Sequence, residues 1–335
     1  MVLTMEQRLA KTVQAMTGGL IPAVPVPRQK NGEIHSEAQE AYAGYLSRQQ
    51  IAGVAVWVHT GRGLHLQAEE RKRIFQSWKS HLNESQLLVA GVGSLIDTTL
   101  SEPLRLQKWR QNSITMAEEA ASGGADALLV FPPVIFKELE SSRRDAAIIE
   151  YHRELSALGV PLILFYLYEE AGGLAYSKEV LRELLGMPSV VGMKMAALDS
   201  VMTLQEVSSL FSSEFPGKLL ITGEDRMFGY SLMCGATGAL VGLGAAFPNI
   251  QSDLITAYRS KDYPLFMDLS SRVDAYAMST FTQPMDKYIM RMLWCLALQG
   301  IIPREAAHDM NGTGYEMEEI ELEMLRQTIQ QCRLY

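Results

Sequence analysis

The chain alternates between short apolar runs and longer amphipathic stretches. Eight runs are rich in Val, Ile, Leu and Ala, at residues 20–24, 53–58, 87–91, 127–131, 161–166, 190–194, 218–222 and 239–242. Their starts lie about 20 to 40 residues apart, which leaves room for a strand, a loop and a returning helix. Because the runs are almost continuously apolar, they are typical of strands buried on both faces. The pattern predicts an α/β fold, a (β/α)8 barrel.

The stretches between the runs carry helix signals. Helices are expected after Ser36 with Gln39, over 69–81, 113–122 and 144–158, and over 177–185 before Gly186. After the eighth run only helical periodicity is present, over 286–299 and 316–334, with a break at Gly312 and Gly314. We therefore expect an N-terminal helical extension (1–17) that covers the bottom of the barrel, the barrel itself (18–249), and a C-terminal helical segment packed on it (250–335).

The composition narrows the classes of partner. The 335 residues are 47% hydrophobic and 20% charged with a net charge of −8, which is ordinary for a globular enzyme and gives no basic face for nucleic acid. No apolar run reaches the roughly 18 residues of a membrane helix, so no membrane partner is expected. Cys234, Cys295 and Cys332 are far apart and form no CxxC pair, which indicates reduced thiols in a cytoplasmic protein. The six histidines lack metal-ligand spacing, so no metal is expected.

Lys194 is the first candidate for chemistry. It ends the sixth apolar run, and in a barrel of this kind catalytic side chains lie at the C-terminal ends of the strands. Burial would lower the pKa of its amine, and a neutral amine can attack a carbonyl carbon and form a Schiff base. The alternative is a lysine that reaches solvent or pairs with Asp199 or Glu224.

The end of the second run supplies the next candidates. His59, Thr60 and Gly61 follow a buried strand, and a turn of this kind exposes N–H groups beside a hydroxyl. Such a nest can hold a carboxylate. The alternative is a plain turn between strand and helix, in which Thr60 and Gly61 serve only the backbone geometry.

Two further signals are weaker. Tyr166, at the end of the fifth run, would place a phenol where it can relay protons to a neighbouring Schiff base, although buried aromatics are more often core residues. Gly223 and Gly242 lie in glycine-bearing loops after the seventh and eighth runs, where barrels often bind phosphate. Neither loop contains a lysine or a long glycine motif.

At these residues the chain resembles the class I aldolases and lyases of the dihydrodipicolinate synthase and N-acetylneuraminate lyase family. The likeness covers roughly residues 18–332. It rests on the V-G-M-K strand at 191–194, H-T-G at 59–61 followed by Leu66 and E-E-R at 69–71, G-V-G-S at 91–94, the G-A-D ending of 117–126, T-G-E-D at 222–225, and the helical C-terminal tail.

The resemblance implies a specific chemistry. A member of this family is expected to be a (β/α)8 barrel without a cofactor, a homo-oligomer (tetramer or dimer), with a small-molecule 2-oxo acid as its partner. Lys194 would form the imine with pyruvate or a related 2-oxo acid. Thr60, with His59 and Gly61, would bind the carboxylate, and the loop at Gly223 would add a substrate contact.

The position of the family's proton-relay tyrosine is ambiguous. Counting back 28 residues from Lys194 leads to Tyr166, whereas counting forward from Pro161 leads to Phe165. Neighbours on a strand point to opposite faces, so only one of the two faces the barrel interior, and Tyr168 shares a face with Tyr166. We predict that Tyr166 occupies the position.

Other family residues are missing. The motif that carries a substrate-binding arginine reads E-E-A-G-G at 169–173, and Pro133 and Val134 replace a pair of tyrosines. Arg62 stands in place of a glutamate. It suits a longer or more acidic substrate, or it pairs with Glu169 or Glu170.

These departures argue against a lysine-biosynthetic synthase. We expect a lyase, either an aldolase or a dehydratase, that forms a lysine Schiff base with a 2-oxo acid such as a 2-keto-3-deoxy sugar acid. The alternative is a catalytically degenerate member that binds a small acid as a sensor or subunit. A third hypothesis is a phosphorylated substrate held near Gly223 and Gly242.

Overall fold

Eight parallel strands close into a barrel, as the sequence predicts. The computed structural model describes residues 4–198, 200–310 and 317–334. Its sheet has the strand order β1-β8-β7-β6-β5-β4-β3-β2. The two end strands meet through a parallel bridge between Ala23 and Ala55, and the Val24 N–H donates to the Ala55 carbonyl at 3.1 Å. The strands are β1 Leu20–Pro22, β2 Gly53–Val56, β3 Leu87–Val92, β4 Ala127–Val130, β5 Leu162–Leu167, β6 Val190–Ala196, β7 Leu219–Thr222 and β8 Gly238–Val241.

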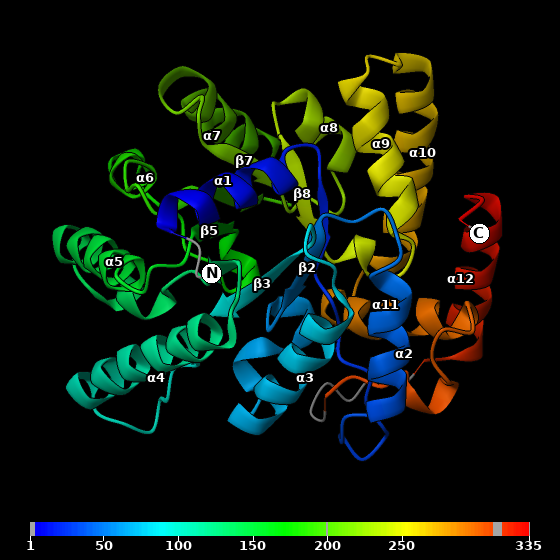
Figure 1. The fold of residues 1–335 in the computed structure, drawn as a ribbon, viewed down its shortest axis with the longest axis horizontal. Helices are drawn as coiled ribbons and strands as arrows, with labels where there is room; N and C mark the ends of the chain where they lie inside the picture. The colour runs from blue at the N-terminus through cyan, green and yellow to red at the C-terminus, as the bar shows by residue number, and fades with distance from the viewer. Residues whose placement is uncertain (1–3, 199, 311–316, 335) are drawn as a thin grey trace.

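Helices surround the strands (Figure 1). They are α1 Met5–Met16, α2 Ser36–Leu46, α3 Ala68–His81, α4 Glu102–Gly123, α5 Ser141–Ser156, α6 Lys178–Leu185, α7 Val201–Glu214, α8 Phe228–Met233, α9 Pro248–Arg259, α10 Tyr263–Thr280, α11 Tyr288–Leu298 and α12 Glu319–Gln331. Helix α6 shows how the sequence sets their limits, since the Ser177 hydroxyl accepts from the Val180 N–H at its start and Gly186 caps its end. Helix α4 is longer than the expected 113–122.

The apolar strands serve two separate cores. In β5, Ile163, Phe165 and Leu167 pack in the barrel interior, whereas Leu164 and Tyr166 pack in the layer between strands and helices. This alternation follows from the two-residue period of a strand. It decides which side chains of each strand can reach the barrel mouth.

Helix α1 packs on the barrel end where the strands begin. Its residues Leu9, Val13 and Met16 join the interior cluster. Lys11 pairs with Asp126, immediately before β4, at 2.7 Å. Helix α1 thus leaves the opposite end, at the strand C-termini, uncovered.

The C-terminal segment is helical. Helices α11 and α12 fall within the expected ranges 286–299 and 316–334, while the expected break at Gly312 and Gly314 lies outside the described residues. Figure 1 shows α9, α10 and α12 together on one side of the barrel. Across the described ranges, we find no helix with the length and apolar character needed to cross a membrane.

Candidate active site

Lys194 points into the barrel near the C-terminal end of β6. It lies opposite Phe165 of β5 in the parallel register, and its Nζ is 4.4 Å from the centre of the Phe165 ring. Lys194 as a whole is only 7% exposed. The interior therefore holds an amine against an aromatic face rather than in bulk water.

Burial changes the protonation of this amine. It lowers the pKa of Lys194 from 10.5 to about 8, against the opposing effect of the Asp225 and Glu224 carboxylates. Burial also raises the pKa of Asp225 from 3.8 to about 6, although the Leu243 N–H donates to its Oδ1 at 2.8 Å and Lys194 acts in the other direction. The two pKa values thus approach one another.

Asp199 and Glu224 were the two carboxylates expected to pair with Lys194, and the structure describes only Glu224. Its Oε1 accepts from the Ala197 N–H at 2.5 Å, so it also fixes the backbone just beyond β6. Asp199 lies outside the described residues. Lys194 is not a solvent-exposed lysine at the end of a strand, because it is almost fully buried.

His59, Thr60 and Gly61 form a short 3-10 helix, η1 (His59–Gly61), directly after β2. The Gly61 N–H donates to the Val58 carbonyl at 3.0 Å, so this amide already serves the turn. The Thr60 hydroxyl lies 3.2 Å from the Tyr288 hydroxyl. The turn therefore offers a hydroxyl pair, from η1 and α11, at the barrel mouth.

His59 is neutral at neutral pH. The surrounding protein desolvates its imidazole, and the nearby charges of Lys194 and Arg62 add to this, so its pKa falls to about 4. The ring is nonetheless open to the cavity described next. It can donate or accept a hydrogen bond there without adding a charge.

A cavity of about 540 Å³ brings these groups together. Its polar lining includes Lys194, Asp225, His59, Thr60 and Tyr288. This volume lies within the usual range for small-molecule sites of ~300 to 1,000 Å³. Four of the predicted residues, Lys194, His59, Thr60 and Gly223, thus line one cavity.

Gly223 and Gly242 leave room for the reactive side chains. A Cβ on Gly223 would lie 2.6 Å from Lys194 Cε, and a Cβ on Gly242 would lie 3.2 Å from Thr60 Oγ1. Both loops therefore line the cavity that contains Lys194, and a phosphorylated substrate held near them would share this cavity.

The structure corrects the choice of Tyr166. Phe165 faces the interior beside Lys194, while Tyr166 packs in the strand–helix layer with its ring centre 6.1 Å from that of Tyr176. Alternation along β5 makes the two positions mutually exclusive. Tyr168, expected to share the face of Tyr166, lies beyond the end of the strand and lines the cavity instead.

Arg62 pairs with the C-terminal segment and not with Glu169, which pairs with Lys137, while the side chain of Glu170 lies outside the described residues. It bonds Asp286 at 2.7 and 2.8 Å and Asp309 at 2.6 Å. The Asp309 side chain is 5% exposed and that of Arg62 is 15% exposed. The guanidinium is thus engaged by two carboxylates, which hold the C-terminal segment over the barrel mouth.

Sequence reasoning missed the contribution of this C-terminal segment. Phe281, Gln283, Met285, Asp286 and Tyr288 line the cavity although they follow the last strand by some 40 residues or more. Asp225 was also missed as a site residue. Its signal was its position two residues after Gly223, in the loop after β7.

The sequence profile of the dihydrodipicolinate synthetase family matches residues 16–298. The chain belongs to this family. The span includes all eight strands and Lys194, so the resemblance seen in the sequence motifs is confirmed.

Relatives within the family are lyases and aldolases. The N-acetylneuraminate lyase of Rattus norvegicus is 28% identical over 265 residues, covering 77% of this chain and 76% of that protein. A protein of Emericella nidulans named "Probable 4-hydroxy-2-oxoglutarate aldolase, mitochondrial" is 24% identical over 250 residues, covering 72% and 74%. This chain is accordingly an enzyme of the lyase and aldolase kind.

Solved structures show the same fold. The sialic acid aldolase of Ruminococcus gnavus superposes with a TM-score of 0.77 at 18% identity, over 95% of this chain and 98% of that one. A prophage protein of the dihydrodipicolinic acid synthase family from E. coli K12, solved with pyruvate, superposes with a TM-score of 0.78 at 20% identity, over 95% and 99%. At these identities the likeness concerns the barrel.

Proposed function

We propose that this protein is a lyase, an aldolase or dehydratase, that forms a Schiff base between Lys194 and pyruvate or a related 2-oxo acid. The observation that carries the proposal is the buried amine of Lys194, with its pKa lowered to about 8, in a cavity beside hydroxyl groups. A binding-only site has no need of a neutral amine. The catalytically degenerate alternative is therefore not favoured.

The first step is attack of the Lys194 amine on the C2 carbonyl carbon of the acid. Water leaves, and the resulting cationic imine withdraws electrons from the bond that is made or broken at C3. The Thr60 and Tyr288 hydroxyls, 3.2 Å apart, support a role in holding the carboxylate, together with the turn that contains His59 and Gly61. Gly223 leaves space for the lysine side chain.

Asp225 is our candidate for accepting the ammonium proton of Lys194. The pKa of the amine is about 8 and that of the carboxyl about 6, whereas their ordinary values are 10.5 and 3.8. Proton transfer between them is correspondingly easier. Asp225→Asn preserves the oxygen that accepts from Leu243, and it should slow imine formation and change its pH profile.

The direct test is release of pyruvate from 2-oxo acid substrates. N-acetylneuraminate, 4-hydroxy-2-oxoglutarate and 2-keto-3-deoxygluconate form a suitable panel, with pyruvate measured by lactate dehydrogenase. Lys194→Ala should abolish release while the circular dichroism spectrum is retained. Lys178→Ala, which removes a lysine whose side chain is 60% exposed, is the matched control and should retain activity. An active Lys194→Ala enzyme would contradict the proposal.

Two broader proposals concern assembly and location. The family likeness supports a homo-oligomer, a dimer or tetramer, which sedimentation would measure. The cysteines Cys234, Cys295 and Cys332 are unpaired, in accord with a cytoplasmic location.

A further inference from the structure

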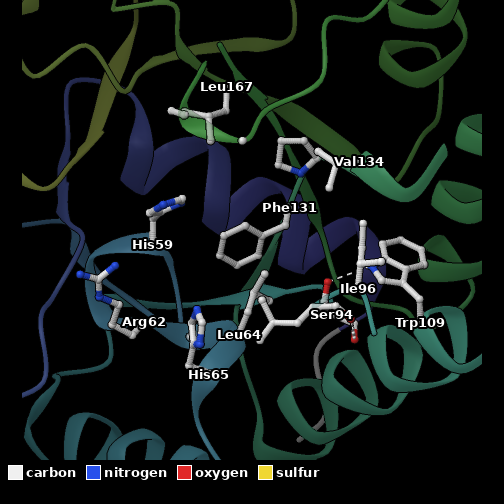
Figure 2. Close-up of a pocket in the computed structure, with 15 residues that line it drawn as sticks. His59, Arg62, Leu64, His65, Ser94, Ile96, Trp109, Phe131, Val134 and Leu167 are labelled. Atoms are coloured by element: carbon white, nitrogen blue, oxygen red, sulfur yellow. Dashed lines mark hydrogen bonds between the residues drawn. The ribbon is translucent and has the colours of Figure 1, made fainter. Parts of the chain in front are cut away.

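A second cavity adjoins the lysine cavity. It has a volume of about 330 Å³ and shares His59, Leu167 and Ala171 with the cavity that contains Lys194 (Figure 2). It lies on the side of β2, β3 and β4, where their following loops supply its wall. A molecule bound at Lys194 can therefore extend into it.

The walls of the second cavity are apolar. Figure 2 shows Leu64, Ile96, Trp109, Phe131 and Val134 around it. Trp109 and Phe131 are 3% and 7% exposed, so both rings are held firmly by the surrounding packing. The volume exceeds the roughly 150 Å³ in which an apolar protein cavity binds benzene.

Most polar groups on these walls already have partners. The Trp109 Nε1–H donates to the Ser94 carbonyl at 2.8 Å, and the Ser94 hydroxyl donates to the Leu95 carbonyl at 3.0 Å. The Arg62 guanidinium is engaged by Asp286 and Asp309. A substrate with several hydroxyl groups would lose its water here, and the side chains that could replace it with hydrogen bonds are few, namely the imidazoles of His59 and His65, which makes binding costly.

An aromatic path joins the amine to this cavity. The Phe165 ring, 4.4 Å from Lys194 Nζ, has its centre 6.3 Å from that of Phe131. Phe131 lies in turn 6.3 Å from the His59 ring and forms part of the second cavity. Apolar surface is thus continuous from the reactive nitrogen to Trp109 and Val134.

We propose that the second cavity binds an apolar, preferentially aromatic, substituent of the aldehyde that this enzyme joins to or releases from the 2-oxo acid. The inference rests on the proposed function and names its second substrate. It replaces the expected sugar chain with a hydrophobic group, because the cavity offers packing and few free hydrogen-bonding groups.

Joining pyruvate to the aldehyde needs no reactant besides these two molecules and water. The imine of pyruvate loses a C3 proton to give an enamine, whose C3 forms a bond to the aldehyde carbon, and the aldehyde oxygen takes a proton and becomes a hydroxyl. Water then hydrolyses the imine, which releases the 4-hydroxy-2-oxo acid and returns the Lys194 amine. Cleavage follows the same steps in reverse.

The first experiment measures binding alone, so that it does not depend on catalysis. Benzyl alcohol and glycerol are compared by ligand-observed NMR with the full-length protein. Benzyl alcohol should bind and glycerol should not. Val134→Trp, which fills the cavity from its rim, should abolish the signal, whereas Met202→Trp adds the same ring at a position that is 71% exposed on α7 and should leave it intact. Ile96→Asn provides a second variant that makes the wall polar without filling the space.

The second experiment measures acceptor choice. With pyruvate, benzaldehyde should be preferred over glyceraldehyde by at least about tenfold in kcat/KM, the scale on which apolar pockets discriminate. Val134→Trp should remove this preference while pyruvate still forms a borohydride-trapped adduct at the wild-type rate. Equal use of both aldehydes, or benzyl alcohol binding that is insensitive to both cavity variants, would overturn the inference while leaving the Schiff-base proposal intact.

Two other outcomes separate the hypotheses. Absence of any pyruvate adduct in the wild type refutes the proposed function, and the binding experiment still decides whether the cavity is aromatic-selective. If benzyl alcohol fails to bind to the wild-type protein, the inference is wrong, whatever the outcome with pyruvate.

Discussion

Replacing Gly223 with alanine should displace the amine of Lys194 without changing its chemistry. The added Cβ would lie 2.6 Å from Lys194 Cε, 3.1 Å from Lys194 Cγ and 3.0 Å from the Met195 carbonyl oxygen. Ordinary contact begins at 3.4 Å, so the lysine side chain must retreat by about 0.8 Å. Lys194 has little space for this movement, because its Nζ packs against the Phe165 ring.

The size of the effect follows from this displacement. A misplacement of about 1 Å in a reacting group can reduce the rate about 100-fold. We therefore expect the rate of pyruvate imine formation, measured by borohydride quenching and intact mass, to fall by one to two orders of magnitude. Overpacking of this kind also lowers the free energy of unfolding by about 1 to 3 kcal/mol.

Gly217→Ala is the matched control. No atom lies within 4 Å of a Cβ at this position, and its backbone does not require glycine. It should trap pyruvate at the wild-type rate. If Gly223→Ala also did so, with an unchanged pH profile, the lysine would not occupy the constrained position described above, and the reasoning would be refuted.

Three further predictions test other parts of the site. Imine formation should rise with pH through about 8 and then level off, because the neutral amine is the nucleophile and burial lowers its pKa from 10.5; a rate that keeps rising beyond pH 10 would show an ordinary lysine. Phe165→Tyr should change the trapping rate and its pH profile, whereas Tyr166→Phe should leave both within twofold, since only position 165 faces Lys194; the opposite pattern would restore Tyr166 to the site. Arg62→Met should lower the free energy of unfolding, measured in urea, by about 3 to 5 kcal/mol, because it leaves the 5% exposed Asp309 without its cation, and adding Asp309→Asn should recover most of this loss. An unchanged urea midpoint would show that the ion pair of Arg62 with Asp309 does not stabilise the fold.

The barrel could be predicted from the sequence because its signal is local and repeated. Each apolar run is buried on both faces, and each of the eight runs became a strand of the parallel sheet. Lys194 was identifiable for a related reason. A charged residue inside a buried strand contradicts its surroundings, and such a contradiction is expected at functional sites.

The error at Tyr166 has a physical explanation. Counting back from Lys194 crosses helix α6 and two loops, whose lengths can vary, and a register shift between β5 and β6. Counting forward from Pro161, the residue before β5, runs along one strand, where alternation is strict, and it leads to Phe165, which faces Lys194. The shorter count within one element was the more reliable one.

Contacts between distant segments were beyond sequence reasoning. Asp286 and Asp309 pair with Arg62 across more than 200 residues of chain, and no local pattern connects them. The same applies to the hydroxyl pair of Thr60 and Tyr288. Such contacts depend on how the C-terminal helices pack on the barrel, which periodicity does not specify.

The central claim is the covalent bond between Lys194 and a 2-oxo acid. The protein is incubated with pyruvate, reduced with borohydride, digested, and mapped by mass spectrometry. We predict one adduct per chain, located on Lys194 and lost in Lys194→Ala. A folded protein that gives no adduct with pyruvate, 2-oxoglutarate or 2-keto-3-deoxygluconate, or an adduct only on other lysines, would contradict the account.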